Sequence, residues 1–213
     1  MMFRSLNEIK PLLLPLLLLA PLLLGACGKD KPPQLAKLPD DAVILAFGDS
    51  LTRGNGSSGS NDYPSQLQAL TGRTVVNGGA PGEVSAQGLE RLPALLDEVQ
   101  PQLLVLVHGG NDLLRRLPNE ALEANLRAMI RLARERGVQV VMLGVPQPAL
   151  LFMSGAEIYP RIAREEGVPI DPTTLAGILG DEQYKSDPIH PNDAGYGRMA
   201  EAVAELLRAS GAL

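Results

Sequence analysis

The fold of this chain is decided by the stretch Val43-Ile44-Leu45-Ala46-Phe47-Gly48-Asp49-Ser50-Leu51-Thr52. Its first five residues are apolar without alternation, which is typical of a parallel strand that is covered on both faces. A Gly-Asp-Ser turn follows at once, and all three residue types favour turns. Because α/β proteins place their sites at the carboxyl ends of such strands, Ser50 is a candidate nucleophile.

Length and composition indicate one globular domain. The chain has 213 residues, of which 45% are hydrophobic and 20% charged, values typical of a folded domain with a sizeable core. The net charge of −5 argues against a nucleic-acid partner, since phosphate binding needs a basic surface. Tryptophan is absent and aromatic residues are 3% of the chain, so stacking of aromatic side chains on bases or sugars is not expected to dominate binding.

The amino-terminal segment has the pattern of an export signal. Arg4 and Lys10 precede a run from Leu12 to Leu24 that is nearly all leucine. This run is shorter than the roughly 20 residues that a membrane span requires. A basic start, a short apolar region and small residues thereafter predict a signal peptide over residues 1–26.

The end of that segment, Leu24-Gly25-Ala26-Cys27, resembles a bacterial lipobox, and Cys27 is the only cysteine of the chain. The resemblance implies cleavage before Cys27 and its acylation, which would make a membrane the partner of this residue. Gly28 in place of an aspartate would favour the outer membrane of a Gram-negative cell, on its periplasmic face. The proline- and lysine-rich residues 27–41 are then expected to form an extended tether.

From residue 42 onward, apolar runs and amphipathic segments alternate. Strands are expected at 43–47, 74–77, 103–107, 138–143 and 168–170, and helices at 63–70, 84–99, 120–136, 156–166 and 193–209. Such alternation predicts a three-layer α/β domain over residues 42–213, with a parallel sheet and right-handed crossovers. The loops after the first three strands contain Ser50, Gly79 and Asn111, which are therefore expected at one edge of the sheet.

A serine nucleophile needs a base that a third group orients. The chain has only two histidines. His190 follows Asp187 by three residues, a spacing that lets the carboxylate bind Nδ1 while Nε2 faces Ser50. His108 is the rival base, but no acid lies beside it in sequence, and we expect it to pack or to form hydrogen bonds near the mouth of the site.

Acyl transfer also requires donors to the developing oxyanion. The candidates are the N–H groups of Ser50 and Gly79 and the side-chain amide of Asn111. A glycine at position 79 would leave the approach of the substrate open. We expect Asp49 and Asp112 to fix loop geometry through hydrogen bonds to the backbone.

Four blocks in order resemble the GDSL/SGNH hydrolase family: Gly48-Asp49-Ser50-Leu51, Asn77-Gly78-Gly79, Gly109-Gly110-Asn111-Asp112 and Asp187-Pro188-Ile189-His190-Pro191. The resemblance covers nearly the whole domain, and the small thioesterase/lysophospholipase/arylesterase subgroup is the most similar. It implies a flavodoxin-like fold, with Ser50 as nucleophile, His190 as base and Asp187 as its orienter. Gly79 and Asn111 would complete the oxyanion hole. His108 and the loop 53–61 depart from the pattern, which bears on substrate preference.

Neither a dinucleotide cofactor nor a metal ion is predicted. Gly54-Asn55-Gly56-Ser57-Ser58-Gly59 matches a dinucleotide motif, but it does not directly follow a strand and lacks the expected downstream acid. We interpret this loop as a flexible lip over an acyl pocket. The sequence has two histidines, one cysteine that resembles a lipidation site, and no cluster of metal-ligand residues, so no metal is expected.

The predicted function is hydrolysis of acyl esters or thioesters through an acyl-enzyme, by a monomer acting in the cell envelope on a small acyl-ester or lipid substrate. Two alternatives remain open at this point. One is a carbohydrate O-deacetylase on the same fold. The other is a non-catalytic envelope-binding lipoprotein, for which a broken set of catalytic residues would be expected.

Overall fold

Five parallel strands form the central sheet, in the order β2-β1-β3-β4-β7. These strands are β1 (Val43–Gly48), β2 (Thr74–Gly79), β3 (Leu103–Val107), β4 (Gln139–Leu143) and β7 (Ile170–Asp171). Every side chain of the central strand β3 is buried, as expected for an apolar run with helices on both faces. The predicted α/β fold with five parallel strands is therefore confirmed.

The computed structural model describes residue 1, residues 31–148 and residues 153–213. Apart from residue 1, the predicted signal peptide lies outside the described residues, and so does Cys27. Residues 31–213 form one compact unit. Within the described ranges, no helix combines the length and the apolar character needed to cross a membrane.

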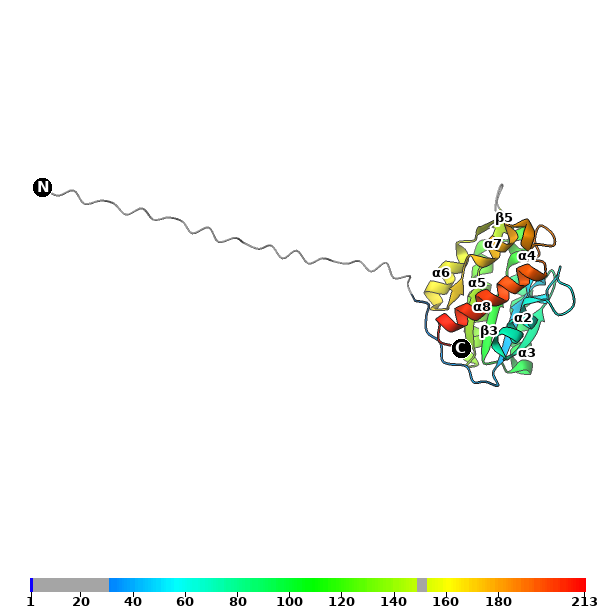
Figure 1. Cartoon of the computed structure of the whole chain (residues 1–213), viewed down its shortest axis with the longest axis horizontal. Helices are drawn as coiled ribbons and strands as arrows, with labels where there is room; N and C mark the ends of the chain where they lie inside the picture. Colours follow the sequence, from blue (N-terminus) through cyan, green and yellow to red (C-terminus); the bar gives the residue numbers. More distant parts are fainter. Residues whose placement is uncertain (2–30, 149–152) are drawn as a thin grey trace. The chain divides into compact units, whose positions relative to one another are not determined.

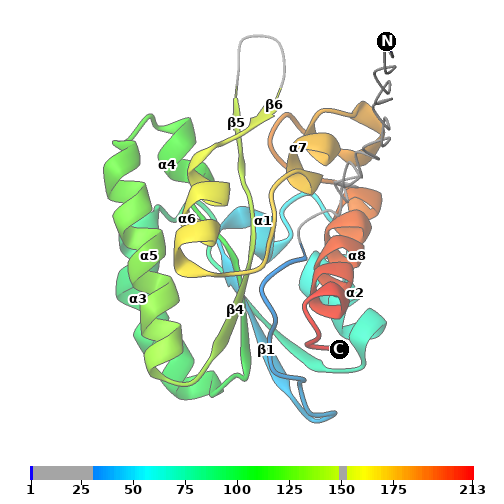
Figure 2. The same ribbon diagram turned by 90° about the vertical axis from the view of Figure 1, so that its left-hand side faces the viewer.

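Helices cover both faces of the sheet. They are α1 (Ser50–Arg53), α2 (Tyr63–Thr71), α3 (Ser85–Val99), α4 (Gly110–Leu114), α5 (Asn119–Glu135), α6 (Ile158–Glu166), α7 (Thr174–Leu179) and α8 (Asp193–Ala209), with a 3-10 turn η1 (Glu182–Tyr184). Helices α3 and α5 pack together on one face, and α2 and α8 pack together on the other (Figures 1 and 2). The three layers place the ends of β1, β2 and β3 beside one another.

The short elements are where the structure differs from the predicted pattern. The fifth strand is at Ile170–Asp171, where it pairs with the end of β4, and not at 168–170, because the Val168 N–H donates to the Ala163 carbonyl at the end of α6. Helices α1, α4 and α7 are too short to show a periodicity. An antiparallel pair, β5 (Pro146–Pro148) and β6 (Met153–Gly155), also follows β4.

Residues 31–41 do not form a free tether, contrary to the prediction. The N–H groups of Leu35 and Leu38 donate to the carbonyls of Ser210 and Ala212, each at 2.8 Å, and the Leu38 side chain is buried. This stretch therefore packs against the carboxyl-terminal end of α8. Leu35 and Leu38, the apolar residues between its prolines, hold this stretch against the core.

Candidate active site

Ser50 is the first residue of α1, directly after β1. Asp49 caps this helix by accepting the Leu51 N–H at 3.0 Å, and the left-handed Gly54 ends it after one turn. The Asp49 side chain is buried, and burial raises its pKa above the usual range. As predicted, Asp49 fixes the geometry of the turn, which leaves Ser50 half-exposed at the sheet edge.

His190 and Asp187 meet Ser50 from the other end of the chain. His190 Nε2 lies 2.9 Å from Ser50 Oγ, and His190 Nδ1 lies 2.8 Å from Asp187 Oδ2. Because the carboxylate accepts the Nδ1–H, Nε2 is the nitrogen that can accept the serine proton.

Asp187 is held in place by the loop that contains it. Its Oδ1 accepts the N–H groups of Ile189 and His190, each at 2.9 Å. Partial burial raises the pKa of Asp187, but the hydrogen bonds from the His190 ring and from the two backbone N–H groups outweigh it and lower the pKa below the usual range. The carboxylate is therefore ionised at neutral pH and fixes the orientation of the imidazole.

The loop 53–61 is not a flexible lip, contrary to the prediction. Ser58 donates its N–H and its hydroxyl to the two carboxylate oxygens of Asp193, at 2.7 and 2.6 Å. Gly56 has a φ of 91°, and a Cβ at this position would overlap with Ser186 Oγ. The loop thus packs against the segment that carries His190, and its residues are not among those lining the catalytic cleft.

Asn111 lies in the first turn of α4. Its Nδ2 donates to the carbonyl of Glu83 at 3.0 Å and has a longer contact of 3.4 Å to Asp49 Oδ2. Asn111 and Ser50 line the same cleft, so the structure brings together the amide and the serine that were predicted to meet. Both hydrogens of the amide are thus directed at protein acceptors, and the bond to Asp49 is the longer of the two.

Gly79 does not fit its predicted role. Its N–H donates to Asn77 Oδ1 at 3.0 Å, and Gly79 is not among the residues lining the cleft. A Cβ at this position would overlap with the backbone of Arg53 in α1. Glycine is therefore required by the close approach of α1 to β2, and not by access of a substrate.

The backbone N–H groups of the loop 79–83 point to a different donor. Acceptors within the described residues occupy the N–H groups of Gly79, Ala80 and Glu83, and Pro81 has none. Gly82, with a φ of 78°, has an N–H for which the described residues 31–148 and 153–213 provide no hydrogen bond. The Pro81-Gly82 dipeptide is the signal that could have drawn attention to this turn.

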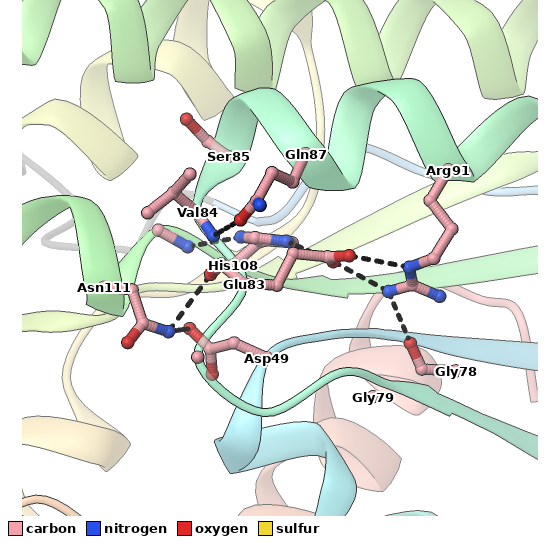
Figure 3. Close-up of polar contacts among 12 residues, drawn as sticks. Asp49, Gly78, Gly79, Glu83, Val84, Ser85, Gln87, Arg91, His108 and Asn111 are labelled. Atoms are coloured by element: carbon pink, nitrogen blue, oxygen red, sulfur yellow. Dashed lines mark hydrogen bonds and ion pairs between the residues drawn. The ribbon is translucent and has the colours of Figure 1, made fainter.

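His108 forms hydrogen bonds, as predicted, but it does so in the interior and is not among the residues that line the cleft. Its side chain is fully buried. Nε2 lies 3.0 Å from Glu83 Oε1, and Nδ1 accepts the Gly109 N–H at 2.8 Å (Figure 3). An acid does accompany His108, but it comes from 25 residues earlier and could not be found from local spacing.

The cleft above Ser50 has an apolar side. Its empty volume is about 420 Å³ with the open mouth included. The lining residues are Asp49, Ser50, Leu51, Gly110, Asn111, Leu114, Val145, Pro146, Leu179, Ile189 and His190. Six of these eleven side chains are apolar, so the reactive atoms lie beside a surface that suits a hydrocarbon chain.

A serine, a histidine and a carboxylate hydrogen-bonded in series, at the carboxyl edge of a parallel sheet, have the arrangement of a serine-dependent hydrolase. A family model described as "GDSL-like Lipase/Acylhydrolase family" matches residues 46–198. The chain belongs to this family, which confirms the predicted resemblance, and the protein is an enzyme of the hydrolase class.

Characterised relatives align over most of their length. Esterase TesA of Pseudomonas aeruginosa is 34% identical over 176 residues, which cover 78% of this chain and 88% of that protein. The Escherichia coli K12 protein named thioesterase 1/protease 1/lysophospholipase L1 is 33% identical over 175 residues, covering 78% and 83%. A crystal structure of TesA matches with a TM-score of 0.72 and 34% identity, over 78% of this chain and 98% of that one.

Proposed function

We propose that this protein hydrolyses acyl esters or thioesters through a covalent acyl-enzyme. Ser50 Oγ attacks the acyl carbonyl while His190 Nε2 takes its proton, and Asp187 stabilises the imidazolium. His190 then protonates the leaving group. Water attacks the acyl-enzyme with His190 again as base, which releases the acid and restores Ser50. The series of contacts at 2.9 and 2.8 Å is the observation that carries this proposal.

The oxyanion formed in each step needs donors that are already aimed at it. We assign the N–H of Ser50, the side-chain amide of Asn111 and, in place of Gly79, the N–H of Gly82. Support for Gly82 comes from the elimination above, since it alone among residues 79–83 has an uncommitted N–H in the described structure. Glu83, the next residue, accepts the Asn111 amide, so the two donors belong to one connected region.

The apolar side of the cleft supports an acyl chain as the group that is bound. Leu114 and Ile189 lie on this side, and the Leu114 side chain is 43% exposed. Covering such a surface with methylene groups gains about 0.8 kcal/mol for each one buried. An ester with a chain of several carbons is therefore expected to react better than an acetate.

The test is a series of p-nitrophenyl esters from acetate to palmitate, assayed with purified protein and with Ser50→Ala as the control. We expect kcat/KM to rise from acetate to butyrate and hexanoate, and Ser50→Ala to be inactive. An optimum at acetate would favour the carbohydrate deacetylase, with acetylated sugars as the next substrates. Absence of turnover on every ester and on a long-chain thioester would overturn the proposal.

We also propose that Cys27 is acylated and holds the enzyme in the cell envelope, at an outer membrane on its periplasmic face. The resemblance of Leu24-Gly25-Ala26-Cys27 to a lipobox supports this. Expression of Cys27→Ser should move the protein from the membrane fraction to the soluble fraction. An unchanged membrane association would contradict the anchor.

A further inference from the structure

His108 and Glu83 join two loops that meet at the candidate active site. His108 directly follows β3 and precedes α4, which contains Asn111, whereas Glu83 precedes α3. The Gly109 N–H donates to His108 Nδ1, so Nε2 carries the hydrogen and donates it to Glu83 Oε1. The imidazole thus links the two loops as a neutral group with both nitrogens occupied.

Glu83 is fixed on its other side by Arg91. Arg91 Nε and Nη2 reach the two carboxylate oxygens, each at 2.8 Å, in the bidentate geometry that is strongest for this pair. Partial burial raises the pKa of Glu83, but the hydrogen bonds from Arg91 and His108, together with the charge of Arg91, outweigh it and lower the pKa to about 2. Glu83 is therefore a fully ionised carboxylate.

Arg91 is itself positioned by two further contacts. Its guanidinium donates to the Gly78 carbonyl at 3.0 Å and lies 4.5 Å from the centre of the Phe47 ring. Figure 3 shows His108, Glu83 and Arg91 in one line along α3. Gly88 in α3 makes room for this line, because a Cβ there would overlap with His108 Nε2.

The backbone of Glu83 connects these three side chains to Asn111, the proposed oxyanion donor. The Glu83 carbonyl accepts Asn111 Nδ2 at 3.0 Å. A second connection between the same loops is made by Asp112, whose carboxylate accepts the N–H and hydroxyl of Ser85 at 2.8 and 2.6 Å. The orientation of the Asn111 amide thus depends on where the loop places the Glu83 carbonyl.

We propose that Glu83 and His108 are positioning residues for catalysis: they fix the Glu83 carbonyl and thereby aim the Asn111 amide at the oxyanion. This inference rests on the proposed function of Asn111 as an oxyanion donor. Neither side chain touches the substrate, so the expected effect is on kcat and not on KM. A displacement of about 1 Å in a catalytic group can cost on the order of 100-fold in rate.

A double-mutant cycle tests the proposal. In the wild-type background, Glu83→Ala and His108→Leu should each lower kcat about 10- to 100-fold with KM within about threefold. In the Asn111→Ala background the same two substitutions should lower kcat by less than about threefold, because the group they position is gone. Glu83→Gln, which keeps the side-chain volume and an acceptor for His108, should recover most of the activity.

Asp97→Ala is the matched control, because Asp97 lies on α3 and its carboxylate also bonds an arginine, Arg136, at 2.8 Å. It should leave kcat unchanged. Equal losses for Glu83→Ala with and without Asn111 would overturn the positioning role and leave a purely structural one. If Glu83→Ala does not fold, as judged by its melting transition, His108→Leu carries the same comparison, and Glu83→Gln stays the conservative variant that should keep most of the activity.

Failure of this proposal is distinguishable from failure of the proposed function. If wild-type protein hydrolyses no ester, or if Asn111→Ala is as active as wild type, the assigned chemistry is wrong. If wild type is active and Asn111→Ala loses about 100- to 1,000-fold, but Glu83→Ala and His108→Leu match wild type in kcat, only the positioning role is wrong.

Discussion

The two histidines of this chain are each hydrogen-bonded to a carboxylate, yet they differ in the partner of the second ring nitrogen. His190 uses Nδ1 to reach Asp187 at 2.8 Å, and its side chain is 14% exposed. His108 uses Nε2 to reach Glu83 at 3.0 Å and is fully buried. The remaining nitrogen of His190 faces Ser50, whereas that of His108 accepts the Gly109 N–H.

This difference shows that a carboxylate partner alone does not make a histidine a base. The free nitrogen decides, because only an imidazole with an unshared acceptor facing a hydroxyl can take up its proton. His190 meets that condition in the cleft. His108 does not meet it, because both of its ring nitrogens are hydrogen-bonded to other protein groups. These two bonds suit it to hold two loops together.

The largest expected effect is the loss of His190. His190→Ala should lower kcat about 10⁴- to 10⁶-fold, because His190 Nε2 is the one hydrogen-bond partner that the described part of the chain gives to Ser50 Oγ. His108→Leu should lower it at least 100-fold less than that. Initial rates on p-nitrophenyl butyrate measure both variants. Comparable losses for the two would erase the distinction between base and positioning residue.

A smaller loss is expected at the orienting carboxylate. Asp187→Asn replaces an acceptor by an amide that does not favour the Nδ1–H form of His190, so kcat should fall about 10³- to 10⁴-fold with little change in the melting temperature. The comparison is with Glu83→Gln, for which most activity should remain. A loss under tenfold for Asp187→Asn would show that His190 is oriented by other contacts.

The smallest expected effect is on the free energy of unfolding. The contribution of Glu83 to this free energy should depend on pH. The pKa of Glu83 is about 2 in the folded protein, against about 4.3 in an unfolded chain. Its stabilising contribution is therefore fully present above about pH 4.3 and lost as the pH falls towards about 2.

Denaturant unfolding of wild type and Glu83→Gln should thus give the same difference in unfolding free energy at about pH 7 and about pH 5, and a smaller one near pH 3. Asp97→Asn, at a carboxylate whose side chain is 65% exposed, provides the control and should show a smaller difference at every pH. A Glu83→Gln difference that grows as the pH falls would contradict the assigned ionisation.

Sequence alone predicted the sheet and the meeting of Ser50, Asp187, His190 and Asn111. Apolar runs of strand length predict buried parallel strands, and the topology of a parallel sheet brings the carboxyl ends of its strands together. The spacing between Asp187 and His190 lies within one loop, so it too can be read locally. The catalytic roles of these residues stay predictions until the variants are measured.

Other features depended on contacts that no local pattern encodes. The partner of His108 lies 25 residues away in sequence, and the buried Leu38 is hidden within a stretch whose prolines resemble a tether. Gly79 and Gly82 are indistinguishable by residue type. The structure separates them: the Gly79 N–H is bonded to Asn77 Oδ1 and its position lets α1 approach, whereas Gly82 has a positive φ and an N–H without an acceptor among the described residues.

The central claim is that Ser50 is the nucleophile and His190 its base. It is tested most directly by treating the protein with a fluorophosphonate and locating the adduct by peptide mass spectrometry, in wild type, Ser50→Ala and His190→Ala. The account predicts one adduct on Ser50 in wild type, none in Ser50→Ala, and labelling slowed by orders of magnitude in His190→Ala. An adduct on another residue, or full-rate labelling without His190, would contradict it.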